Sequence, residues 1–191
     1  ILELISRILG DAFHAMDRVK VPMHHELKAA YFRALRGAFF IMDAGDARRV
    51  KHVLQQKGRS WSHMMAFNFA YIALRVKRYI PSPMVLYYRV KAVFDFFMDK
   101  KDTLTGKPLF HAEAKKAAQR VLAAIRRGEF SDPPGVDFYV RKTDKSGREM
   151  VDSDGLWLYR SIRGTSNLES LHQKLTKAYG HKRAGPQYSY I

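Results

Sequence analysis

The chain has 191 residues and a formal net charge of +16, from 34 Lys and Arg against 18 Asp and Glu. Apolar residues make up 47% of it, which predicts a folded domain rather than a disordered chain. The absence of cysteine excludes disulfides, cysteine-ligated zinc fingers and thiol catalysis. The excess of positive charge favours a polyanionic partner such as nucleic acid, without indicating an activity.

No membrane span is predicted, because the longest apolar stretch, residues 66–74, is far shorter than the ~20 residues that cross a bilayer. No secretory signal peptide is visible, since Glu3 and Arg7 interrupt the first apolar run. Together with the lack of cysteine, these features predict an intracellular protein that has no membrane partner.

Residues 1–10 have the pattern of a short apolar strand, which leads to Asp11. A helix is predicted from about Ala12, and Pro22 breaks it. Apolar residues at helical spacing then predict a second helix over residues 23–42.

Four further helices are predicted before residue 130. Their boundaries come from capping residues, glycines and prolines. The first runs from an N-cap at Asp46 to Gly58, the second from Ser60 to about residue 79, the third through Tyr87 and Phe97, and the fourth over residues 111–127.

The last sixty residues have a different pattern. A turn cluster over 131–135 precedes a predicted strand over 136–142, a hairpin turn at 144–147 and a second strand over 156–162. A final helix is predicted over 166–179, followed by a basic and aromatic tail. The predicted fold class is therefore α/β, mostly helical by residue count.

Two short motifs combine an acid with a histidine three residues further on, Asp11-Ala-Phe-His14 and Glu169-Ser-Leu-His172. An acid at the end of a strand and an acid on a helix packed against the sheet can converge on one divalent cation. Two metal ions held between carboxylates stabilise the attacking and leaving oxygens of phosphoryl transfer. Asp11 and Glu169 are therefore candidate metal ligands.

Both acids also have an ordinary structural explanation. Asp11 precedes a predicted helix, and Asp is a common N-cap residue. Ser166-x-x-Glu169 matches a capping box, in which the Glu bonds back to the N-cap amide. His14 and His172 are equally compatible with partly buried histidines. The residues alone leave both interpretations open.

Arg160 and Arg163 lie on or just after the last predicted strand, where both side chains can reach a phosphate. Ion pairs with Asp152 or Asp154 are the alternative. Most other basic residues alternate with apolar ones, which is typical of solvated helix faces; examples are Arg48, Arg49, Lys51, Arg75 and Lys77.

The order of the motifs resembles a known family. Asp-x-x-His, a long helical stretch and then Arg-Gly-Thr-Ser-Asn-x-x-Glu-x-x-His is similar to DDE-type cut-and-paste transposases with an RNase H-like catalytic core. The likeness is greatest to the D-x-x-H group of Mutator-like elements and their bacterial relatives. Residues 131–172 also resemble transposon-derived proteins of eukaryotes.

The resemblance implies that Asp11 is the second acid of the DDE triad and Glu169 the third, and that both hold Mg²⁺ or Mn²⁺. Residues 1–22 would be one segment of the RNase H-like core, 23–130 an all-helical insertion, and 131–191 the return of the core. In the family the first catalytic Asp lies on an earlier strand, and none of residues 1–10 is Asp. The chain is therefore expected to be either a fragment of a longer protein or a decayed or repurposed copy, and the metal site within it is expected to be incomplete.

The resemblance also implies a DNA partner, with RNA left open, and an intact protein that can form homo-oligomers. The expected phosphate contacts are Arg18, Arg160, Arg163 and His172, with His14 supporting Asp11. The predicted function is DNA binding by part of a metal-dependent strand-transfer core for transposition, in the nucleus if the protein is eukaryotic. The alternative is a non-catalytic helical nucleic-acid-binding protein, either a domesticated transposon fragment or a ribonucleoprotein component.

Overall fold

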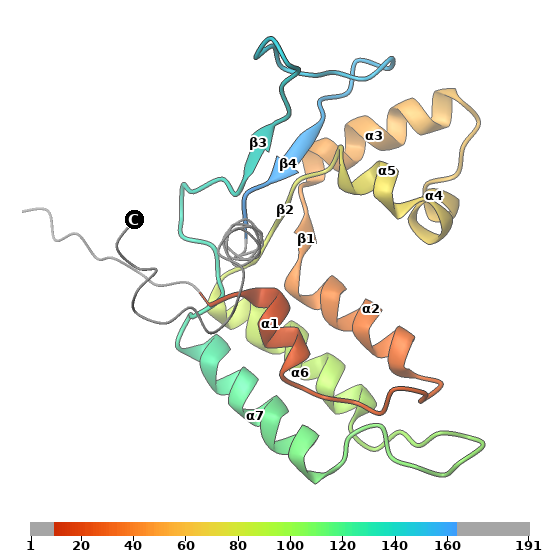
Figure 1. Ribbon diagram of the computed structural model, residues 1–191, viewed down its shortest axis with the longest axis vertical. Coiled ribbons are helices and arrows are strands. Elements are labelled where there is room, and N and C mark those ends of the chain that lie inside the picture. Colours follow the sequence, from red (N-terminus) through yellow and green to blue (C-terminus); the bar gives the residue numbers. More distant parts are fainter. Residues whose placement is uncertain (1–9, 164–191) are drawn as a thin grey trace, which may run out of the picture.

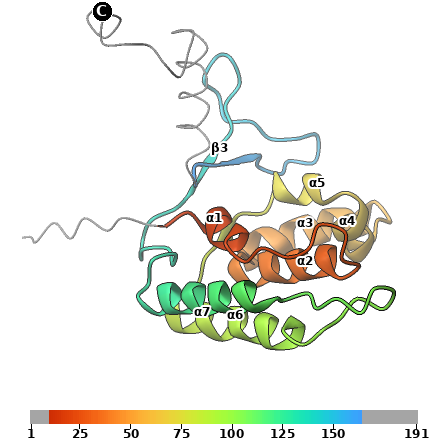
Figure 2. The ribbon, with the colours of Figure 1, turned by 60° about the horizontal axis from the view of Figure 1, so that its bottom comes forward.

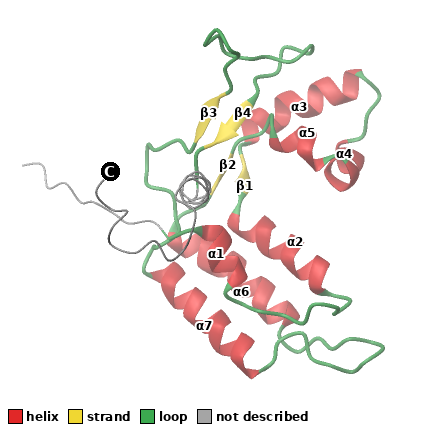
Figure 3. Ribbon diagram, viewed as in Figure 1, coloured by secondary structure: helices red, strands yellow, loops and turns green. Residues whose placement is uncertain are grey.

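A computed structural model describes residues 10–163. In this part of the chain the fold is α/β and mostly helical, with two small antiparallel sheets (Figures 1 and 3). The elements are α1 (Ala12–Asp17), α2 (Lys28–Phe39), β1 (Ile41–Met42), α3 (Ala44–Gln56), α4 (Trp61–Phe67), α5 (Phe69–Ala73), β2 (Arg78–Tyr79), α6 (Pro83–Phe97), α7 (Ala112–Arg126), β3 (Tyr139–Arg141) and β4 (Tyr159–Ser161).

The larger hydrophobic core lies between α1, α2, α6 and α7 (Figure 2). Aromatic rings dominate it, and Tyr31 packs edge-on against Phe110 with ring centroids 5.2 Å apart. Burying such rings removes the most apolar surface per residue from water. The largest side chains with almost no exposure here are Tyr31, Phe39, Phe94, Phe110 and Phe130.

A second, smaller core lies between α3, α4 and α5. Leu156, from the segment between β3 and β4, is buried in it and fastens this segment to the helices. The backbone amide of Tyr159 also donates to the carbonyl oxygen of Leu74 at 2.7 Å. The other buried members are Val50, Leu54, Met64, Ile72 and Val76.

The short strands β1 and β2 join the two cores. They pair antiparallel, with Ile41 opposite Tyr79 and Met42 opposite Arg78. The chain leaves the larger core through β1, builds α3 to α5, and returns through β2 (Figure 1). The expectation that the elements of residues 23–130 are all helical is therefore wrong at these four residues, because cross-strand pairing replaces helix there.

The second helix begins later and ends earlier than the predicted range of 23–42. Residues 22–27 form a turn instead, in which the His25 amide donates to the Pro22 carbonyl and the Glu26 amide donates to the Asp102 carboxylate. These two bonds compete with helix formation. The helix ends at Phe39 because the residues after it extend into β1.

Two other boundaries differ from the sequence prediction. The N-cap of α3 is Asp43, whose carboxylate accepts the Asp46 amide at 2.8 Å, so Asp46 lies in the first helical turn. The helix predicted from Ser60 to residue 79 is two short helices separated at Asn68, which has φ −139° and ψ 50°. Asn has a low helix propensity, which makes it a favourable position for such a break.

The segment containing β3 and β4 has three extended stretches. Val140 lies opposite Arg160 in the β3–β4 pair, and the middle stretch forms bridges from Glu149 to Thr143 and from Val151 to Trp157. The predicted turn at 144–147 is confirmed, since the Gly147 amide donates to the Asp144 carbonyl at 3.1 Å. None of the helices in the described part has the length and apolarity that a bilayer crossing requires.

Gly10→Ala is expected to lower the free energy of unfolding by about 1–3 kcal/mol. A Cβ on Gly10 would lie 2.6 Å from Cε1 of Phe130, a ring that is buried in the larger core. The Gly10 amide also donates to the Glu129 carbonyl at 2.7 Å, so the backbone is held against that ring. Urea unfolding followed by circular dichroism measures the loss.

Gly37→Ala is the matched control for this prediction. Gly37 lies within α2, and no described atom outside the local backbone lies within 4 Å of a Cβ placed there. Alanine at an open helical position is expected to raise the free energy of unfolding by about 0.5–1 kcal/mol. Equal effects of the two substitutions would contradict the close approach of Gly10 to Phe130.

Candidate nucleic-acid interface

Asp11 is the N-cap of α1. Its Oδ1 atom accepts the backbone amide of Phe13 at 2.7 Å and that of His14 at 3.4 Å. His14 is exposed, and its Nε2 atom lies 4.0 Å from Asp11 Oδ2. The capping interpretation of Asp11 is therefore confirmed, and one of its two carboxylate oxygens is engaged with the helix backbone.

Glu169 and His172 lie outside the described residues, so the distance between Asp11 and Glu169 stays open. Within residues 10–163, no group of three or more His, Asp or Glu side chains is placed to hold a metal ion. The described residues alone therefore do not form a metal site, and the binding of Mg²⁺ by Asp11 and Glu169 stays a prediction.

The three arginines expected at the interface differ in accessibility. Arg18, the C-cap of α1, and Arg160, on β4, are both exposed. Arg163 is not, since its side chain is only 10% exposed and both terminal nitrogens bond the Asp132 carboxylate. Its guanidinium also lies 4.3 Å from the Phe138 ring centroid. Arg18 and Arg160 are therefore available to a phosphate as they stand, whereas Arg163 first has to break an ion pair.

Asp132 connects this ion pair to the larger core. Its Oδ2 atom accepts the Ile80 amide at 2.9 Å, and its own amide donates to the Ile80 carbonyl at 3.2 Å. Of the acids considered as partners for Arg163, Asp152 pairs with Arg75 instead. The alternative that Arg163 forms an ion pair is therefore confirmed, but its partner is Asp132 and not Asp152 or Asp154.

A cavity of about 440 Å³ opens between α3, the chain after α5 and the segment that carries β3 and β4. Four cations line it, and Trp157 and Tyr159 add aromatic surface. Burial raises the pKa of the Tyr159 hydroxyl, and the nearby Asp46 carboxylate adds to the effect. The lining cations are Arg49, Arg75, Lys77 and Arg141.

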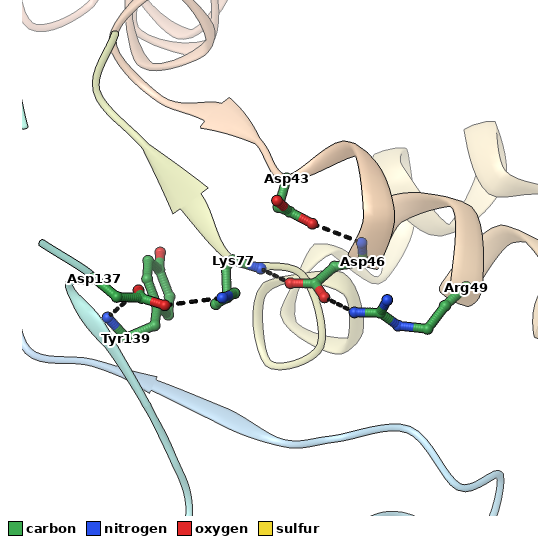
Figure 4. A network of polar contacts seen from close by, with 6 residues as sticks. All are labelled: Asp43, Asp46, Arg49, Lys77, Asp137 and Tyr139. Carbon is green, nitrogen blue, oxygen red and sulfur yellow. Dashed lines mark hydrogen bonds and ion pairs between the residues drawn. The ribbon is translucent and has the colours of Figure 1, made fainter. Parts of the chain in front are cut away.

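Asp46 is the centre of a polar network on one wall of this cavity (Figure 4). Its side chain is 1% exposed, forms an ion pair with Arg49 and accepts the backbone amide of Lys77 at 3.1 Å. The Lys77 ammonium donates to Asp137 Oδ2 at 2.8 Å, and this hydrogen bond raises the pKa of Lys77. The network therefore ties α3 to the start of β2 and to the approach to β3.

Arg75 provides a second tie. Its Nε atom donates to Asp152 Oδ2 at 2.7 Å, and its guanidinium lies 3.6 Å from the Tyr71 ring centroid. Partial burial opposes ionisation of Asp152, but the hydrogen bonds from Arg75 and from two backbone amides outweigh it and lower the pKa of this carboxyl. The expectation that Arg75 lies on a solvated helix face is wrong.

Arg141 forms an ion pair with Glu149 at 2.5 Å. Each of the four cations that line the cavity therefore has an acidic partner. An incoming phosphate would gain little net attraction there, because these acids cancel most of the positive potential. The arrangement is better suited to fixing the β3–β4 segment against α3 than to binding an anion. Asp46 and Arg49 are three positions apart on α3, but Arg75 and Lys77 find their acids 77 and 60 positions away, so sequence spacing does not indicate those two pairs.

A set of exposed cations elsewhere has no such compensation. They lie on α2, α3, α7 and β4, at the C-cap of α1 and in loops, and none of their side chains forms an ion pair, a hydrogen bond or a cation–π contact with another described residue. Because they keep their full charge at the surface, they are the best candidates for phosphate contacts. They are Arg18, Lys20, Arg33, Arg36, Arg48, Arg59, Lys101, Lys107, Arg120, Lys145, Arg148 and Arg160.

Comparison of the chain with models of protein families, with curated proteins and with solved structures gave no match.

Proposed function

We propose that this protein binds nucleic acid through its exposed, uncompensated Lys and Arg side chains. The single observation behind the proposal is the contrast within the described residues. Cations of the cavity are neutralised by acids, while a large set of surface cations is not. With a net charge of +16, such a surface attracts the phosphate backbone at long range.

We further propose that the chain is part of a DDE-type strand-transfer core with an RNase H-like fold. Asp11 and Glu169 would hold Mg²⁺ or Mn²⁺, and the helical residues 23–130 would be an insertion between them. The support is the pair of acid–histidine motifs and the order in which they flank the helices. Arg18 and Arg160, both exposed, would contact phosphates.

The second candidate is a non-catalytic nucleic-acid-binding protein. The observation that favours it is the position of Asp11, whose carboxylate accepts two backbone amides at the start of α1. A capping role accounts for this acid without any metal.

Glu169→Ala separates the two candidates when Mn²⁺ affinity and duplex affinity are both measured. For the strand-transfer core we expect loss of Mn²⁺ binding with most of the DNA affinity kept, because the metal and the phosphates use different side chains. Calorimetry with MnCl₂ and fluorescence anisotropy with a labelled duplex supply the two readouts.

Glu113→Ala is the control for this experiment, since Glu113 is an exposed acid in the first turn of α7. Its removal is expected to change neither affinity. If Glu169→Ala lowers only the melting temperature and leaves Mn²⁺ affinity as in the control, Glu169 is a capping residue and the non-catalytic candidate holds.

A further inference from the structure

The loop between α6 and α7 projects beyond the ends of the helices (Figures 1 and 2). Leu104 lies in this loop and is 94% exposed, more than any other large apolar side chain of the described residues. Lys101 and Lys107 flank it, both exposed and neither in an ion pair with another described residue. An apolar side chain is thus displayed between two free positive charges.

Asp102 holds the loop in one conformation. Its Oδ1 atom accepts the Leu104 amide at 3.1 Å, the Thr105 amide at 2.8 Å and the Thr105 hydroxyl at 2.9 Å. Its Oδ2 atom accepts the Glu26 amide at 3.1 Å. These bonds, led by the one from Glu26, lower the pKa of Asp102 to about 2. The turn closes at Gly106, whose φ of 67° suits glycine.

The turn before α2 anchors the same loop from outside. The Glu26 carboxylate accepts the Thr103 amide at 2.9 Å and the Thr103 hydroxyl at 2.7 Å. The buried His25 ring lies 3.2 Å, through Nε2, from the Lys107 carbonyl oxygen. At the base of the loop, the Leu109 amide donates to the Lys100 carbonyl at 2.9 Å. Both sides of the loop are therefore fixed.

A single exposed leucine on a loose loop would need no explanation. Here a buried carboxylate and a second acid are used to order the segment that displays it. Ordering before binding reduces the entropy that a contact would otherwise cost. Proteins that bend DNA insert apolar side chains between base steps while cations hold the adjacent phosphates. The loop has both parts of that arrangement.

We propose that the loop over residues 101–108 is a wedge for duplex nucleic acid. Leu104 enters between two base pairs, and Lys101 and Lys107 contact the phosphates on either side. This inference rests on the proposed function, since it assumes that the protein binds nucleic acid. A membrane surface is the less suitable partner, because interfacial anchoring uses a broad apolar face and here one leucine stands between two threonines.

Leu104→Ala tests the wedge in the full chain. The probe is a short duplex carrying 2-aminopurine, whose fluorescence rises when the base is unstacked. With the unsubstituted protein we expect binding and a rise in fluorescence. The substitution is expected to weaken binding about tenfold, as loss of a buried leucine contact requires, and to abolish the fluorescence rise. The melting temperature should not change, because the side chain is exposed.

Met84→Ala is the matched control, since Met84 is an apolar side chain that is 65% exposed and lies in the first turn of α6, at the end of the helix opposite this loop. It is expected to leave affinity and fluorescence unchanged. Lys107→Gln adds a second readout, a decrease of about 1 in the slope of log affinity against log salt.

The outcomes separate the wedge from the function on which it rests. If the unsubstituted protein binds the duplex and Leu104→Ala binds equally well, the wedge is overturned and the proposed function stands. If the unsubstituted protein binds no duplex even at low salt, both fail. Binding to phosphatidylserine vesicles that depends on Leu104, with duplex binding that does not, assigns the loop to a membrane and also overturns the wedge.

Discussion

The affinity of the protein for duplex DNA is expected to fall at least a hundredfold between 50 and 200 mM salt. Each phosphate that a cation neutralises releases condensed counterions and adds about 0.9 to the slope of log affinity against log salt. About four such contacts suffice for this loss, and the described surface carries more uncompensated cations than that. Fluorescence anisotropy over a series of salt concentrations gives the slope.

Substitutions of unpaired and of paired cations show which side chains carry this salt dependence. Arg33 and Arg36 lie on the exposed side of α2 without an ion pair to another described residue, so Arg33→Gln with Arg36→Gln is expected to lower the slope if α2 faces the duplex. Lys115→Gln with Lys116→Gln also removes two cations of one helix, but these are already paired with Asp99 at 3.2 Å and with Glu113 at 3.1 Å, and the substitution is expected to have less effect. An affinity indifferent to salt would contradict a phosphate-led interface altogether.

Asp132→Ala is expected to lower the free energy of unfolding by about 2–4 kcal/mol. The substitution removes the acid that pairs with the nearly buried Arg163 guanidinium, and it also removes the acceptor of the Ile80 amide. For a chain of this length the loss corresponds to a decrease in melting temperature of roughly 5–12 °C. Thermal and urea unfolding measure both quantities.

Asp137→Ala is the control for this loss. Its carboxylate also pairs with a cation, Lys77, but is 55% exposed. Water already solvates an exposed pair, so its removal is expected to cost less than about 1 kcal/mol. The double variant Asp132→Leu with Arg163→Met is expected to recover part of the stability, because an apolar pair replaces a partly desolvated ionic one. Equal losses for Asp132→Ala and Asp137→Ala would show that burial does not decide the cost.

The long helices α6 and α7 were predictable because their boundaries are local. Pro83 occupies the first turn of α6, and Gly128, with φ 76°, follows the end of α7. The turn before α2 was not predictable in the same way. It depends on a bond from the Glu26 amide to Asp102, which is 76 positions away. Strands of two residues, such as β1 and β2, are too short to give a periodic signal.

In the candidate site, too, local contacts were predictable from the sequence and long-range contacts were not. The capping role of Asp11 depends on the next three residues and was one of the two interpretations that the sequence offered. The partner of Arg163 is 31 positions away, and an acid closer in sequence was expected instead. The convergence of Asp11 and Glu169 is still a prediction, because Glu169 lies outside the described residues.

The antiparallel pairing of β1 with β2 has a consequence for the architecture as a whole. It brings the two ends of residues 43–77 side by side, so the intervening helices form a unit outside the larger core, and Leu156 from the β3–β4 segment completes their small core. A module whose two ends are neighbours can be lengthened, shortened or replaced during evolution without separating the helices that flank it. The sequences of α1, α2, α6 and α7 and of the unit over residues 43–77 can therefore diverge at different rates.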